Sequence, residues 1–469
     1  MGVPAGRRVA ALLGGVLLLV ACSTPISPSA SASPSASASV TASPTAGIGD
    51  VVSAPGSSST IYEPNPRAIV VAIDPGHGGC LDWGVPDPLR RGTAFSEKTM
   101  NLAIATELRR QLLAQGVSVM LTRDGEDLLA GDDYPDLGCH GAPFRDVNGD
   151  GESGFDPVGD PLGKTRARDE GEARIDKVNV ARADLLVSIH INSLYQDGVT
   201  FQIAATQTYY TDETTWGISA SQRLARLVQD AVVAAIAPLA TYDRQDRGIE
   251  SRNYYVITPP LFTPTAERPD PLTQPTRGVL MPAILTEVGS INLAAEQDLL
   301  LSPEGQAAIV AGIAKAISAY LADRPLAVRY DALVDSGEAG AVPAAVPGSG
   351  PPYWIPPVDP ATLASGLGVR LTNTGTRAWP AGLHLLVGWE ASEQPYLRRP
   401  PESLTPLEVT IPALAPGESV ELRLPLSPPA GAPRTVAWIT LATGDAALTD
   451  LGSPPLQLAA SAPAPHARK

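Results

Sequence analysis

Four side chains in this sequence have the types and positions that could form a metal site. His77 and His190 each end an apolar stretch that reads as a strand, in VVAIDPGH and DLLVSIH. Glu97 opens a helical stretch, and Glu287 ends a third apolar stretch, PAILTEVG. Imidazole nitrogens and carboxylate oxygens suit zinc, and a catalytic zinc keeps three protein ligands and one position for water. Two histidines and two glutamates at strand and helix ends therefore suggest a catalytic zinc site.

Each of these residues also has an ordinary structural explanation. A histidine after a strand is more often a structural residue than a ligand, and a glutamate at a helix start such as Glu97 suits the helix dipole. Glu287 is harder to explain in this way, because its apolar neighbours predict burial and a buried carboxylate needs a partner. The glycines around His77, in DPGHGG, are more than a turn needs and indicate a close approach to the backbone.

The elements that would position these side chains alternate between strand and helix over residues 68 to 322. This alternation predicts an α/β fold with a mostly parallel, twisted central sheet flanked by helices. In such a sheet, ligands bind at the carboxyl ends of the strands, where His77 and His190 lie. Strands are predicted at 68–73, 117–123, 184–192, 200–210, 253–257 and 282–289, and helices at 97–116, 172–183, 219–236 and 302–321.

Five motifs occur in order along this region: IDPGHGG, SEKTMNLAIATELRRQL, VSVMLTR, ADLLVSIHINS and PAILTEVGSINLAAEQDLL. Together they resemble the zinc-dependent N-acetylmuramoyl-L-alanine amidases of bacterial cell walls, type 3. The resemblance implies that His77, Glu97 and His190 bind Zn²⁺ and that Glu287 moves protons in catalysis. It also implies the substrate, which is peptidoglycan, cut at the amide bond between N-acetylmuramic acid and L-alanine. Ser290 departs from the family, in which an aromatic residue is common there.

One connection in the region is much longer than the others. Residues 124–169 are acidic and rich in Gly and Pro, and we expect them to form an insertion that walls or covers the substrate cleft. Within it, Asp146, Asn148 and Asp150 alternate and precede a glycine, as in the first half of a Ca²⁺ loop. The twelfth position is Pro157 and not an acid, so an acidic turn that binds no ion is the alternative.

The first 22 residues predict export. Two arginines, an apolar run and small residues before Cys22 form a secretory signal peptide that is too short to span a membrane comfortably. The ending LVAC resembles a bacterial lipobox, which implies a lipid on Cys22 and anchoring to the outer face of the cytoplasmic membrane. An ordinary signal peptide with a chance cysteine is the alternative. In an exported chain, Cys80 and Cys139 are compatible with one disulfide, although their spacing does not establish it.

The remaining segments divide the chain. Residues 23–65, rich in Ser, Ala and Pro, predict a disordered tether, and residues 66–324 form the expected zinc amidase domain. Residues 325–358 read as a Pro/Gly-rich linker. Short strands between Gly/Pro turns over 359–460 predict an all-β sandwich, and the pairing of LTNTGTRAW with LAPGESVELRLPL resembles bacterial Ig-like accessory domains.

The balance of charge narrows the range of partners. The chain has 34 Lys and Arg against 49 Asp and Glu, a formal net charge of −15, so we expect no nucleic-acid partner and membrane contact only through Cys22. The sequence thus predicts a lipid-anchored zinc amidase of peptidoglycan. Another zinc peptidase or amidohydrolase on the same scaffold is one alternative, and a catalytically inactive wall-binding regulator is the other.

Overall fold

The computed structural model describes residues 69–460, except 157, 161–162, 194, 197–198, 201, 213–216, 259–277, 334–357, 359, 393–399, 430–433 and 445. The expected signal peptide, Cys22 and the expected tether therefore lie outside the described residues. Two structural regions follow one another along the described chain. The first is an α/β region that ends with the helix at Pro303–Ala322, and the second is an all-β region that begins at Val328.

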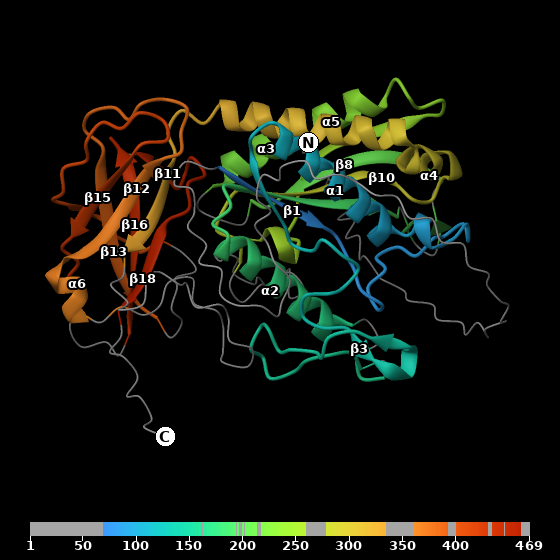
Figure 1. The fold of residues 1–469 in the computed structure, drawn as a ribbon, viewed down its shortest axis with the longest axis horizontal. Coiled ribbons are helices and arrows are strands. Elements are labelled where there is room, and N and C mark those ends of the chain that lie inside the picture. Colours follow the sequence, from blue (N-terminus) through green and yellow to red (C-terminus); the bar gives the residue numbers. More distant parts are fainter. Residues whose placement is uncertain are drawn as a thin grey trace, which may run out of the picture. The chain divides into compact units, whose positions relative to one another are not determined.

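A six-stranded sheet forms the centre of the α/β region (Figure 1). Neighbouring strands run parallel except at the β10–β8 pair, so the predicted mostly parallel sheet is confirmed. The strands β1, β5 and β10 lie side by side and run parallel. Their carboxyl-terminal ends therefore lie at the same end of the sheet. In sheet order the strands are β2 (Ser118–Leu121), β1 (Val70–Pro75), β5 (Leu185–Asn192), β10 (Ala283–Ser290), β8 (Ala204–Tyr210) and β9 (Arg244–Ser251).

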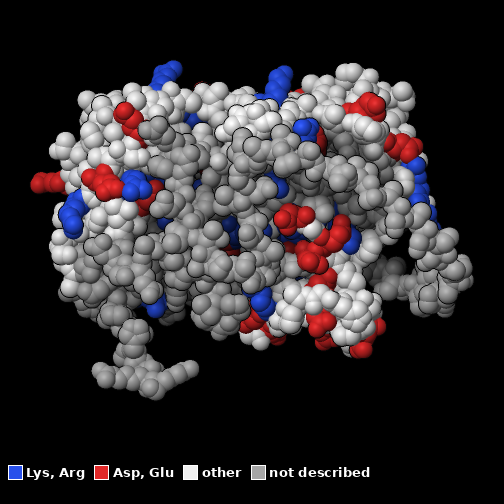
Figure 2. Space-filling view, viewed as in Figure 1, with Lys and Arg blue, Asp and Glu red and all other residues white. Residues whose placement is uncertain are grey.

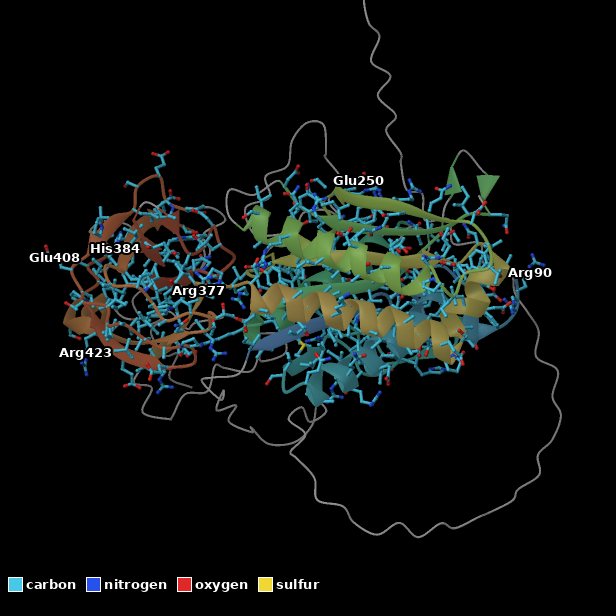
Figure 3. The ribbon with its side chains drawn as sticks, turned by 90° about the horizontal axis from the view of Figure 1, so that it is seen from above. Arg90, Glu250, Arg377, His384, Glu408 and Arg423 are labelled. Atoms are coloured by element: carbon cyan, nitrogen blue, oxygen red, sulfur yellow. A yellow bond between two sulfur atoms is a disulfide. The ribbon has the colours of Figure 1, made fainter. Side chains whose placement is uncertain are left out.

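Helices cover both faces of this sheet, because alternate residues of each buried strand point to opposite sides. Val71 and Ile73 pack with α1 (Glu97–Ala114), α3 (Ile218–Ile236) and α5 (Pro303–Ala322). Val70 and Ala72 pack on the other face with α2 (Lys164–Val180) and the 3₁₀ turn η3 (Tyr255–Ile257). Seen from above, α3 and α5 lie side by side (Figure 3).

The helix α5 is the one described helix that is long and apolar enough to cross a membrane. Length and composition alone are weak support for a span, because the core helix of a globular domain passes the same test. Ile309, Ile313 and Ile317 lie one turn apart in α5 and are fully buried in the core shared with α1 and α3. The helix therefore has the packing of a core helix.

Three local expectations differ from the structure. The predicted strand at 253–257 is the 3₁₀ turn η3, and the edge of the sheet is instead β9, with Glu250 on it (Figure 3). The sequence of β9, RQDRGIES, lacks an apolar alternation because an edge strand is half solvated. The helix expected from residue 172 begins at Lys164, and a further helix, α4 (Ala294–Leu301), precedes α5.

The insertion contains little regular structure ahead of α2. The two short strands β3 (Asp133–Tyr134) and β4 (Cys139–His140) pair around the 3₁₀ turn η2 (Pro135–Leu137). Two more short pieces, η1 (Thr93–Phe95) and the pair β6 (Tyr195–Gln196) and β7 (Val199–Thr200), occur elsewhere in the α/β region. In Figure 2, acidic side chains gather at lower right, over the part of the molecule where Figure 1 labels β3.

The C-terminal region is all-β apart from α6 (Pro360–Gly366). Two antiparallel sheets share one apolar core, which contains the fully buried Trp379. The strand β11 lies inside the stretch expected to be a linker, yet it pairs with β12 along its length. One sheet has the order β11 (Val328–Leu333), β12 (Leu367–Asn373) and β15 (Ser419–Leu424), and the other β14 (Thr405–Leu407), β13 (His384–Ala391), β16 (Thr435–Thr443) and β17 (Ala446–Ala447), with β18 (Leu456–Ala460) also on β16.

Candidate active site

The turn after β1 presents His77 at the end of the sheet. Pro75 ends the strand, and His77 follows Gly76 with a φ of 62°, a left-handed conformation that is uncommon for a non-glycine residue. A Cβ on Gly76 would lie 2.3 Å from the ring of His190. The residue at 76 must therefore be glycine for the two imidazoles to approach, and their ring centroids are 4.8 Å apart.

Glu97 reaches the same point from the first position of α1. The residue is 3% exposed, and its carboxylate accepts hydrogen bonds from the backbone N–H groups of Val85 (2.8 Å) and Ile191 (3.1 Å). Those two bonds fix its orientation between the loop after β1 and the strand β5. A Cβ on Gly84 would lie 2.4 Å from both the Glu97 Oε2 atom and the His77 ring, so this second glycine also makes room for the cluster.

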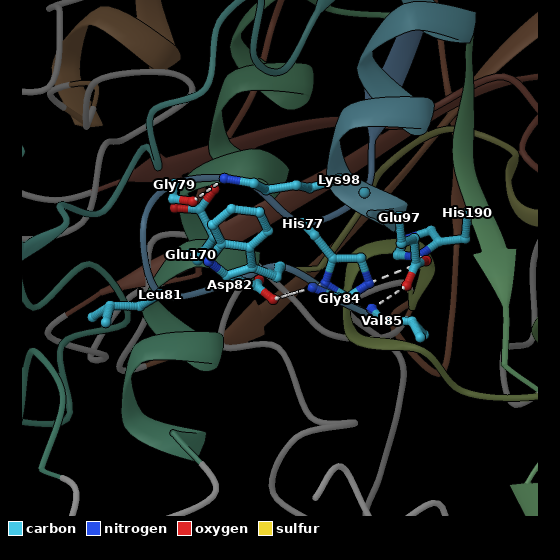
Figure 4. A network of polar contacts seen from close by, with 12 residues as sticks. His77, Gly79, Leu81, Asp82, Gly84, Val85, Glu97, Lys98, Glu170 and His190 are labelled. Carbon is cyan, nitrogen blue, oxygen red and sulfur yellow. Dashed lines mark hydrogen bonds and ion pairs between the residues drawn. The ribbon is translucent and has the colours of Figure 1, made fainter. Parts of the chain in front are cut away.

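The donor atoms of His77, Glu97 and His190 converge (Figure 4). Glu97 Oε1 lies 3.3 Å from His77 Nε2 and 3.0 Å from His190 Nδ1, and the three ligand atoms all lie within 4.8 Å of one another. Tetrahedral ligands about 2.0 Å from a zinc ion are about 3.3 Å apart, so the two separations from Glu97 Oε1 and the donor set fit zinc. The structure thus brings together the three residues that the sequence suggested as ligands.

Asp82 holds His77 from the other side. Its Oδ1 atom lies 2.8 Å from His77 Nδ1, which leaves Nε2 directed at Glu97 (Figure 4). A carboxylate on the outer ring nitrogen fixes the tautomer and the orientation of a metal-binding histidine. Sequence reasoning missed Asp82, although a carboxylate five residues after a candidate ligand was an available signal.

Glu287 lies beside His190, because β10 and β5 pair in parallel and these two residues face each other in the register. Its Oε2 atom is inaccessible to solvent and has no hydrogen-bond partner among the described residues. Burial and the nearby Glu97 carboxylate raise the pKa of Glu287 well above its usual range. A carboxyl group in this state is available to exchange a proton with a bound molecule.

The electrostatics of the cluster differ between its two glutamates. Burial by itself would raise the pKa of Glu97, but His77 and His190 hold it well below its usual range. Burial opposes protonation of His77, yet Glu97 and Asp82 raise the pKa of this imidazole well above the usual value. Glu97 is therefore ionised as a ligand must be, whereas Glu287 is not locked in that form.

A buried network of ion pairs and hydrogen bonds holds the backbone of the His77 turn. Arg174 of α2 donates to the backbone oxygens of Pro75 (2.8 Å) and His77 (2.7 Å) and contacts Asp74 Oδ1 (2.7 Å). Arg123 donates to the backbone oxygens of Pro75 and Gly76, both at 3.0 Å. Burial opposes ionisation of Asp74, but Arg174 and two hydroxyl groups lower its pKa to about 2. This support was missed in the sequence, because its partners are about 50 to 100 residues apart along the chain.

The insertion begins against the same turn. Cys80 and Cys139 form a disulfide with a Cα–Cα distance of 5.7 Å. The carboxylate of Asp132 accepts from the backbone N–H groups of Cys80 and Leu81, the latter at 3.3 Å. The base of the insertion is thereby fixed three residues beyond His77. His140, which follows the disulfide, is exposed.

The candidate calcium residues lie further along the insertion. Asp146 and Asp150 are exposed, and Asn148 is 8% exposed. They form a tight turn and take no part in the cluster around His77. In the structure these residues therefore belong to a feature of the insertion that is separate from that cluster, and calcium binding stays a prediction.

Comparison with known proteins decides the family. The sequence profile described as N-acetylmuramoyl-L-alanine amidase matches residues 71–319, which is just over half of the chain. This chain belongs to the N-acetylmuramoyl-L-alanine amidase family. The matched range contains His77, Glu97, His190, Glu287 and the insertion, and the C-terminal β region lies outside it.

Two curated relatives come from Bacillus subtilis (strain 168). An uncharacterized protein, YqiI, is 25% identical over 250 residues, covering 53% of this chain and 84% of its own length. A germination-specific N-acetylmuramoyl-L-alanine amidase is 22% identical over 255 residues, covering 54% and 81%. Among solved structures, the catalytic domain of the amidase CwlV from Bacillus (Paenibacillus) polymyxa var. colistinus is 26% identical, with 54% of this chain and 98% of that chain covered and a TM-score of 0.35.

Proposed function

We propose that this amidase hydrolyses the bond between N-acetylmuramic acid and L-alanine in peptidoglycan, with zinc as its cofactor. The observation that carries the proposal is the convergence of His77, Glu97 and His190 near Glu287, whose Oε2 atom has no hydrogen-bond partner among the described residues. Family membership supports the substrate class, and the donor set supports the metal.

In this proposal, His77 Nε2, His190 Nδ1 and the Glu97 carboxylate hold the ion. When bound there, zinc acts as a Lewis acid on the scissile carbonyl and on the attacking water. Asp82 keeps His77 in the tautomer that leaves Nε2 free to bind. The backbone N–H groups of Val85 and Ile191 keep the Glu97 carboxylate in place.

Glu287 carries the proton. Its carboxylate takes a proton from the attacking water and gives it to the leaving α-amino group of L-alanine. Such a step needs a carboxyl group that both accepts and releases a proton, and a pKa raised above the usual range of a glutamate favours acceptance of the proton. Its position next to His190 in the β5–β10 register supports this role.

We also propose that the protein is exported and anchored by a lipid on Cys22. The support is the sequence of residues 1–22, followed by the Ser/Ala/Pro-rich stretch 23–65 that would let the amidase domain reach the wall. The C-terminal β region would then be an Ig-like accessory domain.

The function is tested by metal analysis and digestion of defined muropeptides with the purified full chain. We expect one zinc per chain and new amino termini on L-alanine, with the glycan strands left intact. Cleavage between amino acids within the stem peptide would instead identify a peptidase. A zinc-loaded protein that binds peptidoglycan without cleaving it would identify a regulator.

A further inference from the structure

The acidic turn of the insertion is folded around its own carboxylates. Asp146 Oδ1 accepts from the backbone N–H groups of Gly149 (2.7 Å) and Asp150 (3.2 Å), and Asp146 Oδ2 accepts from Gly151 N–H (2.8 Å). Asn148 Oδ1 accepts from Asp150 N–H at 3.0 Å. Gly151 allows the sharp turn with a φ of 89°. By itself this turn is a common acidic loop and indicates no ligand.

A separate residue, Asp169, faces this turn from α2. Its Oδ1 atom accepts from the backbone N–H groups of Val147 (2.8 Å) and Asn148 (3.2 Å), so the carboxylate points into the turn. The residue is 1% exposed, and its Oδ2 atom is inaccessible and has no hydrogen-bond partner within the described part of the chain. A buried carboxylate oxygen without a partner is unfavourable, and a bound cation would remove this cost.

The charges around Asp169 are mostly negative. Burial, together with Asp146 and Asp150, raises the pKa of Asp169 to about 6, although two backbone N–H groups oppose the shift. Among the described residues, the basic group that contacts the turn is Arg168, whose Nη1 atom lies 3.3 Å from Asp150 Oδ2. Asn148 Nδ2 donates to the same oxygen at 3.0 Å. Three acids and an amide oxygen therefore share a space with one arginine at its edge.

We propose that Asp146, Asn148, Asp150 and Asp169 form a Ca²⁺ site, in which Asp169 replaces the acid that a continuous loop carries at its twelfth position. Pro157 occupies that position in the chain, which is why the sequence alone left the loop incomplete. An oxygen-only ligand set with alternating Asp and Asn suits Ca²⁺, whereas zinc is usually bound through nitrogen or sulfur.

Such an ion joins the insertion to α2. The next residue of α2, Glu170, accepts from the backbone N–H of Ala130 at 2.9 Å, near the base of the insertion. One turn later, Arg174 holds the His77 turn. Calcium binding thus stabilises the insertion on the helix that supports the catalytic cluster, and it takes no part in the zinc site itself.

The test compares calcium binding by the purified full chain with that of Asp169→Asn. Asparagine still accepts from the two backbone N–H groups but removes the charge of Oδ2, so the turn keeps its shape. The matched control is Asp136→Asn, which changes an exposed acid of the same insertion. Calorimetry measures the affinity, and thermal unfolding with and without Ca²⁺ measures the stabilisation.

We expect the wild type and Asp136→Asn to bind one Ca²⁺ with a Kd of about 10⁻⁴ to 10⁻³ M and to unfold a few degrees higher with the ion. Asp169→Asn should bind at least about tenfold more weakly, because one charged ligand is lost. If that variant fails to fold, Asp150→Asn should show the same loss. The variant His77→Ala should keep calcium binding, since the two sites share no residue.

Three results would overturn the proposal. The first is a wild type that shows neither heat of binding nor stabilisation at about 10 mM Ca²⁺, a concentration about tenfold above the largest expected Kd. The second is an unchanged affinity in Asp169→Asn. The third is loss of calcium binding in His77→Ala, which would place the ion at the zinc cluster.

Discussion

At the scale of single residues, Glu97 and Glu287 lie in different surroundings, and the proposed function gives them different roles. Glu97 is held ionised by two histidines and two backbone N–H groups. Glu287, on β10 beside His190, is half-buried, its Oε2 atom has no hydrogen-bond partner among the described residues, and its pKa is raised. Environments that push two carboxyl groups apart in pKa separate a ligand from a proton carrier. The roles proposed here therefore follow from the neighbours of each residue.

The variant Glu287→Gln tests this division. Turnover of a muropeptide should fall by about 10²–10⁴-fold, because a general acid–base is removed, while the zinc content should stay at the wild-type level. The comparison variant His190→Ala should lose zinc and activity together. Measured metal content and kcat distinguish the two cases, and a zinc-free Glu287→Gln protein would make Glu287 a ligand.

Gly76→Ala tests the space between the imidazoles. A methyl group 2.3 Å from the His190 ring must displace that ring, so zinc affinity should fall by about 10–100-fold, the range seen when ligand orientation is disturbed. Gly125→Ala is the matched control, because nothing lies within 4 Å of its added Cβ. Competition with a zinc chelator gives both affinities. Equal affinities would mean that the His77–His190 approach does not matter for binding.

At the scale of elements, the site depends on a contact between β1 and α2 that no local pattern describes. Arg174 connects Asp74 at the end of β1 to Glu170, one turn earlier in α2. Ser188 of β5 and Thr122 after β2 also donate to Asp74, at 2.6 and 2.5 Å. Four segments thus meet at one carboxylate beneath the His77 turn, and the turn is rigid because they do.

Asp74→Asn should lower the free energy of unfolding at pH 7 by about 3 kcal/mol, because Arg174 loses one of its buried carboxylate partners. The folded-state pKa of Asp74 is lowered to about 2, so its ionic contribution is complete above pH 4 and is lost as the pH falls towards 2. The difference from wild type should therefore shrink by about 2 kcal/mol over that interval. Denaturant unfolding of both proteins across this pH range measures it, and a difference that stays constant would contradict the assignment.

The insertion is expected to act on substrate access and not on chemistry. Its base is fixed near His77 by the Cys80–Cys139 disulfide and by Asp132. Replacing residues 124–163 by a short Gly/Ser linker, with Cys80 changed to Ser, should leave zinc binding intact. Activity on intact cell wall should change much more than activity on a small muropeptide, because only the large substrate needs a wall or lid. Equal effects on both substrates would mean that the insertion has no role in access to the large substrate.

At the scale of the whole molecule, the organisation predicted from sequence is a lipid anchor, a tether, an amidase domain and a β domain. Membrane attachment depends in this view on the sulfur atom of Cys22, since α5, the one described helix with suitable length and composition for a span, packs as a core helix. In this prediction, the length of the tether would set how far the amidase domain reaches from the membrane.

Cys22→Ser should therefore move the protein from the membrane fraction to the soluble or secreted fraction. In the proposed lipoprotein, the lipid would be attached through the thiol of Cys22, and stable anchoring to a bilayer takes more than one acyl chain or a second binding signal. Fractionation in low and high salt, followed by immunoblotting, provides the measurement. A variant that remains in the membrane fraction at high salt would contradict the lipobox interpretation.

The sequence by itself determined the features that depend on short stretches. Apolar runs that end in His77, His190 and Glu287 predicted the strands and the end of the sheet where a site would lie, because burial and hydrogen bonding impose that periodicity locally. The resemblance of five ordered motifs predicted the ligand set, and the structure brings those side chains together. The family match over residues 71–319 agrees with the resemblance that the motifs indicated.

Only the tertiary structure decided the features that join distant positions. The polar strand β9 forms an edge because β8 lies beside it, and Asp74 meets Arg174 across 100 residues. The loop that starts at Asp146 has Pro157 and not an acid at its twelfth position, and α2 places Asp169 against the turn instead. The type of each side chain can be read from the sequence at its own position. Which side chains share a buried space depends on how the sheet and the helices pack, and no short stretch of sequence contains that information.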